Sequence, residues 1–510
     1  MAASPVRTPG FGWSLHAEWT KLRTVRGWVA GLAVAALVTV LLGALAAASS
    51  RTTCGGGPRA LPCPAPPAGP SGAAVEDGFY LAHRALTGDG AITARLTSMT
   101  GVIVYPPPDH DTIVSGLVPW AKAGIMIKES TRQGSAYAAL MLTGGHGVRM
   151  QHDFTEDTPG RPGGVTAGSP RWLRLTRTGD TLTGHESPDG ARWTEVGTAR
   201  LPGLPRTVRV ALFVASPGDL TVKPGVLGAA ATSRFTQTTA VFDNVTLRGR
   251  TTTPWTARNI GPEDRRLDHL PAFKESRGTV TLTGSGDIAP LLTGQKIENT
   301  LPGLLLALTA LIVLATAYIT AEYRHGLIRT TLLATPGRRG CLLAAKAAVL
   351  AAVTFVTTGA ASAATVLLGT RLLRAGGNHV LPVSLLTGLR VVLGAAALLA
   401  LAAVLVLSLG AVLRRAVLAV TVGIAVLVVP YVLATTSVLP QAASEWLLRL
   451  TPAAGFAILQ SIPAYPQVIA YYAPVAGFHP LPPWAGLTVL SAYTALAFTL
   501  GVIRLRRSAA

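Results

Sequence analysis

Six long apolar runs constrain this chain more than any other feature. Each is close to the roughly 20 residues that an α-helix needs to cross the hydrocarbon core of a bilayer. The runs cover residues 28–49, 301–321, 342–369, 389–412, 416–438 and 484–503. No such run occurs in residues 51–290, although 49% of all residues are hydrophobic and only 13% are charged. The sequence therefore predicts a polytopic α-helical membrane protein with six transmembrane helices.

The first apolar run is interpreted as a retained span. It is too long for the apolar region of a secretory signal, and a charged segment, residues 1–27, precedes it. The expected order is an interface helix (1–27), the first span (28–49), a Pro/Gly-rich linker (50–74), a β domain (75–250), a return segment (251–299) and the remaining spans (300–510).

Basic residues predict the orientation. Short cytoplasmic loops of membrane proteins carry an excess of Lys and Arg. The segments before the first span, between the second and third, between the fourth and fifth and after the sixth are rich in these residues. The short loops on the other side hold only Arg371, Arg374, Arg390 and Arg449. Both termini are therefore predicted to be cytoplasmic, in a bacterial plasma membrane, with the β domain outside.

The net charge of +20 does not indicate nucleic-acid binding, because the Arg residues are scattered without a basic stripe interleaved with aromatic residues.

The cysteines fit the predicted topology. Cys54 and Cys63 follow the first span in an oxidising compartment and are close enough in sequence to form a disulfide. Cys341 stands at the cytoplasmic start of the third span, where we expect an inert, reduced thiol.

Residues 75–250 have the pattern of an all-β sandwich. Leu173 and Leu175 alternate with Arg174 and Thr176, and the sequences TGD and SPDG supply turns on either side of the next strand. Such period-two runs between Gly, Asp and Pro clusters predict antiparallel hairpins. Further strands are expected in GIMIKES, SAYAALMLT, HGVRMQH, TVRVALFVAS and TAVFDNVTL.

Four ordered motifs of this region resemble those of concanavalin A-like lectin and glucanase jelly rolls. They occupy residues 123–130, 172–180, 187–193 and 242–245. The resemblance implies a carbohydrate-binding role, with Tyr137, Trp172 and Trp193 as candidates for stacking on sugar rings. The competing interpretation is that these three residues fill the core or cover a hairpin.

A glucanase activity is not expected. A retaining glycosidase needs two carboxylates about 5 Å apart, and no strand carries the Glu-x-Asp or Glu-x-Glu alternation that would place them so. Asp189 and Asp243 could ligate calcium, but a turn position and a strand position favour structural roles. No metal site is predicted.

Two segments are open to alternative interpretations. Residues 251–299 contain TVTLTGSGDIAP, which could add a strand or return the chain to the membrane. Residues 439–483 begin with an amphipathic piece too short to span and continue with Pro and aromatic residues. They are predicted to form a re-entrant or surface-lying helix on the outer side.

Two membrane-proximal motifs are similar to those of the permease subunits of type-two ABC exporters of the actinobacterial type. They are WSLHAEWTKLRTVRGW, before the first span, and AEYRHGLIRTTLLATPGRRGCLLAAK, between the second and third. The resemblance implies a permease dimer in the lipid bilayer with two ATPase subunits bound in trans. The large β insertion departs from the minimal family pattern, so the exported substrate is not specified.

The same motifs supply candidate functional residues. In the first, Leu15, Trp19, Leu22 and Val25 are predicted to share the apolar face of an interface helix, with Glu18, Lys21 and Arg26 off that face. In the second, the candidates for contact with a moving ATPase are Glu322, Arg324, Arg329, Arg338 and Arg339. The competing interpretations are a simple membrane anchor and a solvated basic loop.

The chain lacks the means to use ATP alone. No Gly-Lys dipeptide occurs, so the phosphate-binding loop is absent; ATP and magnesium are expected on the partner. The spans carry few ionisable residues, which disfavours ion-coupled transport. The alternative to an exporter permease is a membrane-anchored carbohydrate-binding protein or sensor, and a glycan or cell-wall ligand is the partner that it would need.

Overall fold

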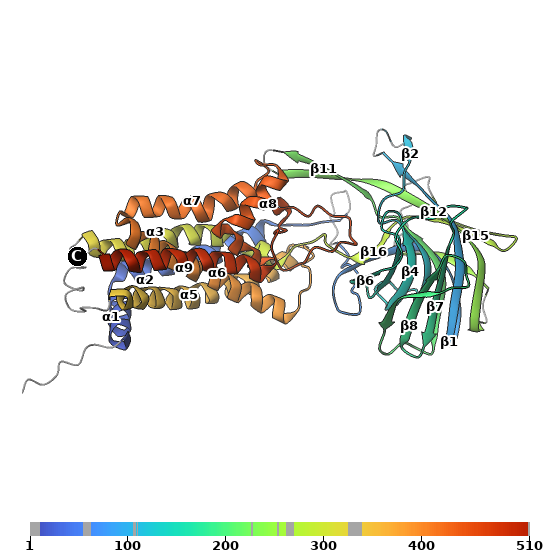
Figure 1. The fold of residues 1–510 in the computed structure, drawn as a ribbon, viewed down its shortest axis with the longest axis horizontal. Helices are drawn as coiled ribbons and strands as arrows, with labels where there is room; N and C mark the ends of the chain where they lie inside the picture. The colour runs from blue at the N-terminus through green and yellow to red at the C-terminus, as the bar shows by residue number, and fades with distance from the viewer. Residues whose placement is uncertain are drawn as a thin grey trace, which may run out of the picture.

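The computed structural model describes residues 11–54, 63–105, 109, 111–225, 228–251, 254–261, 270–324 and 339–507. The chain forms a bundle of helices and a separate β domain (Figure 1). In chain order every strand falls between the second and third helices of the bundle. A large β domain inserted in the sequence of a helical protein was the expected architecture.

Six of the described helices are long and apolar enough to cross a membrane. They are α2 (Arg26–Ser49), α3 (Gly303–Arg324), α5 (Arg339–Ala375), α6 (Leu385–Leu413), α7 (Ala416–Thr435) and α9 (Pro483–Arg507). Each matches one predicted apolar run, with ends that differ by a few residues. The chain is therefore a membrane protein.

Helix α6 forms the centre of the bundle. In the most apolar stretch of α6, 72% of the residues are buried, whereas the share is 22% in the corresponding stretches of α2 and α7. Small residues let the backbones approach one another: a Cβ added to Gly303 of α3 would lie 2.8 Å from the Cα of Thr39 in α2. Close packing of this kind is how helices associate when lipid replaces water.

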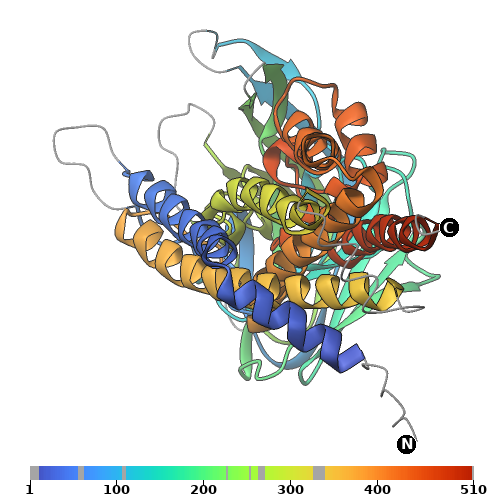
Figure 2. The same cartoon turned by 90° about the vertical axis from the view of Figure 1, so that its left-hand side faces the viewer.

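Helix α1 (Phe11–Thr24) precedes the first candidate span and does not continue it. Val25 separates the two helices with an extended backbone (φ −85°, ψ 103°). As a result α1 lies across the end of the bundle, beside α5 (Figures 1 and 2). This position agrees with the helix predicted before the first span.

One long strand, β1 (Val75–Val104), organises the β domain. Its first half pairs with β10 (Thr207–Ala215) and its second half with β7 (Arg171–Thr178) and β12 (Gly228–Thr251), all antiparallel. The order continues from β10 through β3 (Lys122–Lys128), β4 (Tyr137–Thr143), β5 (Val148–His152) and β6 (Glu156–Pro159), and from β7 through β8 (Thr181–Ser187) and β9 (Thr194–Arg200). The register between β1 and β12 shifts at several points, as it does at a β-bulge. A bulge bends the strand that carries it. The nearly closed sheet resembles a jelly roll.

Both faces of the β10–β3–β4 region are buried. Ile125 and Ile127 face the main core of the sandwich, whereas Met126 belongs to a second cluster on the opposite face. That second cluster also contains Tyr137 and Phe213. Strands buried on both faces lose the simple alternation of apolar and polar residues, as in the wholly buried GIMIK of β3.

The sheet extends beyond residue 250, so the return segment belongs to the β domain. It supplies β13 (Thr256–Ile260), β14 (Ala272–Ser276), β15 (Thr279–Gly284) and β16 (Asp287–Pro290). β15 pairs with β12, and β16 pairs with the first residues of β1. The short strands β2 (Ile113–Ser115) and β11 (Asp219–Gly225) complete the described sheet.

The segment between α7 and α9 is helical in short pieces. It contains α8 (Gln441–Leu450) and the 3₁₀ helices η2 (Pro452–Leu459) and η3 (Pro474–Ala476). All eight residues of η2 are buried, and a Cβ added to Gly486 of α9 would lie 2.1 Å from the carbonyl oxygen of Ala454. The segment therefore packs into the bundle through η2.

Candidate functional site

The best-defined polar site is a buried ion cluster at the end of the bundle where α3 ends and α5 begins. Glu18 of α1, Glu322 of α3 and Lys346 of α5 come from three separate segments. Their exposed fractions are 2%, 4% and 0%. Charged side chains are almost never buried to this extent without partners, so their mutual contacts decide the local structure.

Lys346 is the centre of the cluster. Its Nζ donates to Glu18 Oε2 at 2.7 Å and to Glu322 Oε1 at 2.7 Å. The Nζ also lies 4.7 Å from the centroid of the Tyr318 ring, whose hydroxyl donates to Glu18 Oε2 at 2.9 Å. One ammonium group thus joins α1, α3 and α5.

Lys21 closes the cluster from the side of α1. Its Nζ donates to Glu322 Oε1 and, at 3.3 Å, to Glu18 Oε1. Burial alone would lower the pKa of Lys21, but the hydrogen bond to Glu322 and the charges of Glu18 and Glu322 raise that pKa above its ordinary value. Lys21 therefore stays charged, and two carboxylates face two ammonium groups.

The charge balance explains how the cluster can be buried. Removing one member of a buried ion pair costs about 3–5 kcal/mol, because the remaining charge is left without compensation. Here two carboxylates depend on Lys346, and Glu322 Oε2 has no hydrogen-bond partner among the described residues. The position of α1 is consequently tied to the relative placement of α3 and α5.

The predicted coupling residues lie in different parts of the structure, and only some of them are described. Glu322 is drawn into the bundle and pairs within the chain, so it is not part of a solvated loop. Arg324 ends α3 and Arg339 begins α5, and only their backbone positions are described. Arg329 and Arg338 lie outside the described residues.

The structure also shows which residues of α1 face the bundle. Glu18 and Leu22 are its buried residues, Leu15 is half-buried, and Trp19 and Val25 are both 43% exposed. Glu18, predicted to lie off the apolar face, is buried against the bundle because Lys346 and Tyr318 supply it with partners. Arg26 starts α2 and is exposed.

Sequence reasoning did not identify Lys346 and Tyr318 as site residues. The sequence does contain a signal for this site. A lysine within one apolar helix and an acidic residue at the end of another each need a charged partner. Which residues would meet could not be read from either helix alone.

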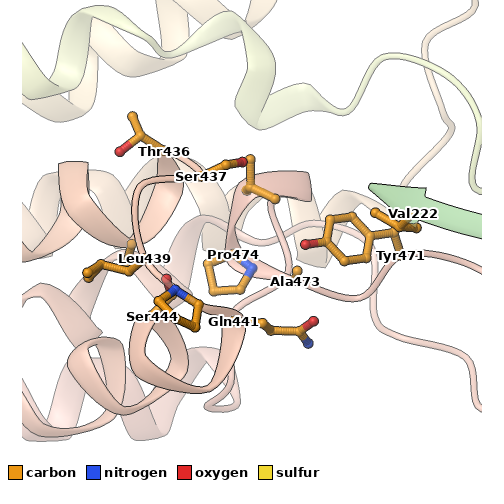
Figure 3. A pocket seen from close by; sticks show the side chains of 12 residues that line it. Val222, Thr436, Ser437, Leu439, Gln441, Ser444, Tyr471, Ala473 and Pro474 are labelled. Carbon is orange, nitrogen blue, oxygen red and sulfur yellow. The ribbon is translucent and has the colours of Figure 1, made fainter. Parts of the chain in front are cut away.

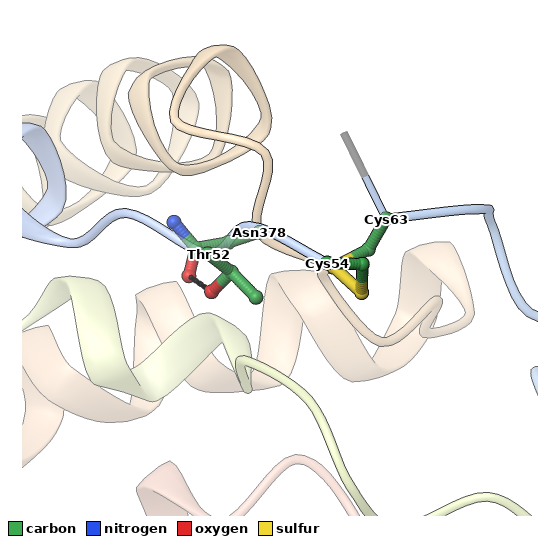
Figure 4. The surroundings of a disulfide bond; sticks show 4 residues. All are labelled: Thr52, Cys54, Cys63 and Asn378. Carbon is green, nitrogen blue, oxygen red and sulfur yellow. Dashed lines mark hydrogen bonds between the residues drawn. A yellow bond between two sulfur atoms is a disulfide. The ribbon is translucent and has the colours of Figure 1, made fainter. Parts of the chain in front are cut away.

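At the opposite end of α2 the chain is fastened to α5. Asn378 donates to the carbonyl oxygen of Ser50 at 2.8 Å and accepts from the Thr52 hydroxyl at 2.7 Å. Two residues further on, Cys54 and Cys63 form a disulfide bond (Figure 4). This arrangement fixes the exit of the chain from α2 toward the β domain, while Cys341, a half-buried free thiol, lies at the start of α5.

The aromatic candidates for sugar stacking are engaged in packing. Tyr137 is fully buried in the second cluster. The Arg95 guanidinium lies 5.5 Å from the Trp172 ring centroid, and the Gly190 turn packs against the Trp172 ring. Arg174 lies 3.7 Å from the Trp193 ring centroid.

The two aspartates considered for calcium also have structural partners. Asp243 pairs with Arg95, and Asp189 accepts hydrogen bonds from the backbone of Ala191 and Arg192. In the part of the chain that the structure describes, no group of three or more His, Cys, Asp or Glu residues is arranged to hold a metal ion.

A small cavity lies between the segment that follows α7 and strand β11. Its volume is about 280 Å³, and its lining includes Val222, Ser437, Gln441, Tyr471 and Pro474 (Figure 3). The lining carries no charged side chain. Because ligand sites usually enclose at least about 300 Å³, we assign no ligand to this cavity.

Comparison with known proteins adds little to this geometry. No family model and no curated protein matches the chain. Similar solved structures include a Saccharomyces cerevisiae protein of unknown function, with 16% identity, coverage of 33% of this chain and 73% of that chain, and a TM-score of 0.21. Another is scytalido-glutamic peptidase with a transition-state analogue inhibitor, with 11% identity, coverage of 41% and 98%, and a TM-score of 0.29.

These TM-scores are too low to support an argument about fold or activity. The class is therefore defined by the chain itself: a membrane protein with six apolar helices, a jelly-roll-like β domain inserted in its sequence, and an ion cluster buried at one end of the bundle.

Proposed function

We propose that the chain is the membrane-spanning permease subunit of an ATP-driven exporter that works with a separate ATPase subunit. The observation that carries this proposal is the buried cluster in which Lys346 joins Glu18 and Glu322. An interface helix held in this way moves together with α3 and α5. A push by a partner on α1, or on the basic segment 325–338, would therefore reach the bundle.

The proposed coupling role of Glu322 is now indirect. Its carboxylate is buried, so it serves as a positioning residue that holds α1 against the bundle. The basic residues Arg324, Arg329, Arg338 and Arg339 remain the proposed contacts with the ATPase. The proposal retains cytoplasmic termini, an extracytoplasmic β domain inserted between the first two spans, and assembly as a permease dimer.

The alternative, a membrane-anchored carbohydrate-binding protein or sensor, loses its main support. Its three candidate stacking residues are buried or packed against arginines. Six spans also exceed the one or two that an anchor needs. The alternative remains a prediction that a glycan array with the intact protein would test.

Co-expression with an ATP-binding-cassette ATPase encoded beside this chain tests the proposal. We expect the two to co-purify and ATP hydrolysis to depend on the assembled complex. Glu322→Gln, which keeps the shape but removes the charge, should reduce hydrolysis several-fold without preventing membrane insertion. Glu445→Gln on α8 is the matched control, since its partly exposed pair with Arg449 is worth about 1 kcal/mol or less.

Two results would reject the proposal in different ways. Failure of any such ATPase to co-purify would remove the exporter function. Normal hydrolysis with Glu322→Gln would leave the exporter but remove the coupling role of the cluster. The orientation is tested separately with an impermeant thiol reagent on sealed cells: Cys54 and Cys63 should react only after reduction, and Cys341 should stay unlabelled.

A further inference from the structure

Three basic side chains gather on one face of the β domain without an acidic partner. β1 pairs with β10 on one side and β13 on the other at residues 80–83. Ala85 of β1 is opposite Arg209, and Leu81 is opposite Arg258. Because residues i and i+2 of a strand share a face, His83 lies on the same face as both arginines and diagonally between them.

His83 is buried yet incompletely bonded. It is 8% exposed, and its Nδ1 has no hydrogen-bond partner among the described residues. A buried polar group without a partner in a native structure requires an explanation, and a bound water or ion is one of the few available. His83 also lies at the edge of the second cluster, since its opposite residue Ala211 belongs to that cluster.

The charges around His83 are all positive. Burial, followed by the charges of Arg209 and Arg258, lowers the pKa of His83 to about 4. Neither arginine forms an ion pair within the described part of the chain, whereas Lys128, opposite Arg209 on β3, is already neutralised by Asp77. The uncompensated positive charge beside His83 is therefore that of the two arginines.

We propose that His83, Arg209 and Arg258 form a binding site for a phosphate group on the β domain. A phosphate offers several strong acceptor oxygens and up to two negative charges, which match two guanidinium groups and one imidazole. A carboxylate has one charge and two oxygens and would leave part of this positive potential uncompensated. Arginine is suited to phosphate because its planar fork donates two parallel hydrogen bonds.

The phosphate source is either free phosphate or a phosphate ester of a polymer. The proposal is independent of transport, since all three residues lie in the β domain. Isothermal titration of the intact protein in detergent with inorganic phosphate, with a poly(glycerol phosphate) chain and with acetate separates these ligands. We expect inorganic phosphate to bind at one site per chain and more tightly than acetate. A higher affinity per chain for the polymer would identify an ester as the ligand.

The decisive variant is Arg209→Gln combined with Arg258→Gln. Charge-assisted hydrogen bonds are strong enough that each loss should weaken phosphate binding by about tenfold or more. The charge-matched control is Arg132→Gln combined with Arg192→Gln, whose side chains are 81% and 88% exposed. Unchanged phosphate affinity in the first variant, equal losses in both variants, or tighter binding of acetate than of phosphate would overturn the proposal.

Discussion

The helical bundle and the β domain both bury lysine ammonium groups, but they compensate the charges differently. In the β domain Lys128 donates to Asp77 at 2.8 Å and to the carbonyl oxygen of Ser135 at 2.9 Å. Lys122 likewise donates to Asp287 and to the carbonyl oxygen of Ile288 at 2.7 Å. Each of these lysines has one carboxylate and one fixed backbone acceptor.

In the bundle Lys346 has two carboxylates from different helices and no backbone acceptor among the described residues. A lysine held by a carbonyl oxygen of the main chain cannot move unless the local fold changes. A lysine shared between side chains can exchange partners as helices shift. The difference indicates that the β-domain pairs fasten the fold, whereas the bundle cluster is suited to coupling separate helices.

The largest expected effect is that of Lys346→Met. It leaves Glu18 and Glu322 buried with only Lys21 to compensate them, so we expect about 3–5 kcal/mol of destabilisation. Thermal unfolding in detergent measures the effect. Adding Glu322→Gln should recover much of the stability, because Lys21 then has one buried carboxylate to compensate in place of two. A single variant as stable as the parent would show that the cluster is not buried in solution.

Lys128→Met tests the isolated pair of the β domain. We expect a loss of about 3 kcal/mol, because Asp77 is left buried with the Gly134 amide as its remaining donor. Combining it with Asp77→Asn should restore most of the stability, since asparagine can still accept from that amide. In contrast to Lys346→Met, neither variant should change ATP hydrolysis by the assembled complex; a change would break the distinction between the two regions.

Acid should destabilise both regions, each through one buried histidine. Burial and nearby positive charge lower the pKa of His83 to about 4, and burial followed by the charge of Lys296 lowers that of His479 to about 4. Because each folded-state pKa lies below the ordinary value of 6.5, the stabilisation is present above pH 6.5 and is lost as the pH falls toward 4.

We expect each histidine to account for about 2 kcal/mol of that loss. Unfolding temperatures of His83→Gln and His479→Gln, measured between pH 4 and 7, should fall less steeply than those of the parent. His16→Gln on the exposed surface of α1 is the control and should keep the parental slope. Parental slopes in both buried variants would contradict the prediction.

The smallest effect is expected from a partly exposed ion pair. Arg449 lies 3.2 Å from Glu445 on α8, with side-chain exposures of 36% and 26%. Pairs of this kind contribute under about 1 kcal/mol, because water screens them and side-chain entropy is lost. Arg449→Gln should therefore shift the unfolding temperature little. A shift as large as that of Lys346→Met would show that burial is not what separates these pairs.

Local sequence patterns were sufficient to predict helices in the bundle and strands in the β domain. Six apolar runs predict six long apolar helices, because crossing a bilayer imposes length and composition on a continuous segment. The alternation around Leu173 and Leu175 predicts β7 because one face of that strand is buried. The extension of the sheet through β15 and β16 was only one of two open interpretations, since their strand partners lie in β12 and β1.

Only the tertiary structure decided how the chemistry-bearing residues meet. Glu18 was predicted to lie off the apolar face of its helix, a pattern that did not show its burial against Lys346, which is 328 residues away and supplies the opposite charge. In the same way, His83 is set between Arg209 and Arg258 by strand pairing rather than by sequence spacing. Burying a charge depends on its partner, and that partner comes from a distant part of the chain; apolar runs and alternation are local, so the sequence by itself determines the elements and the fold determines the sites.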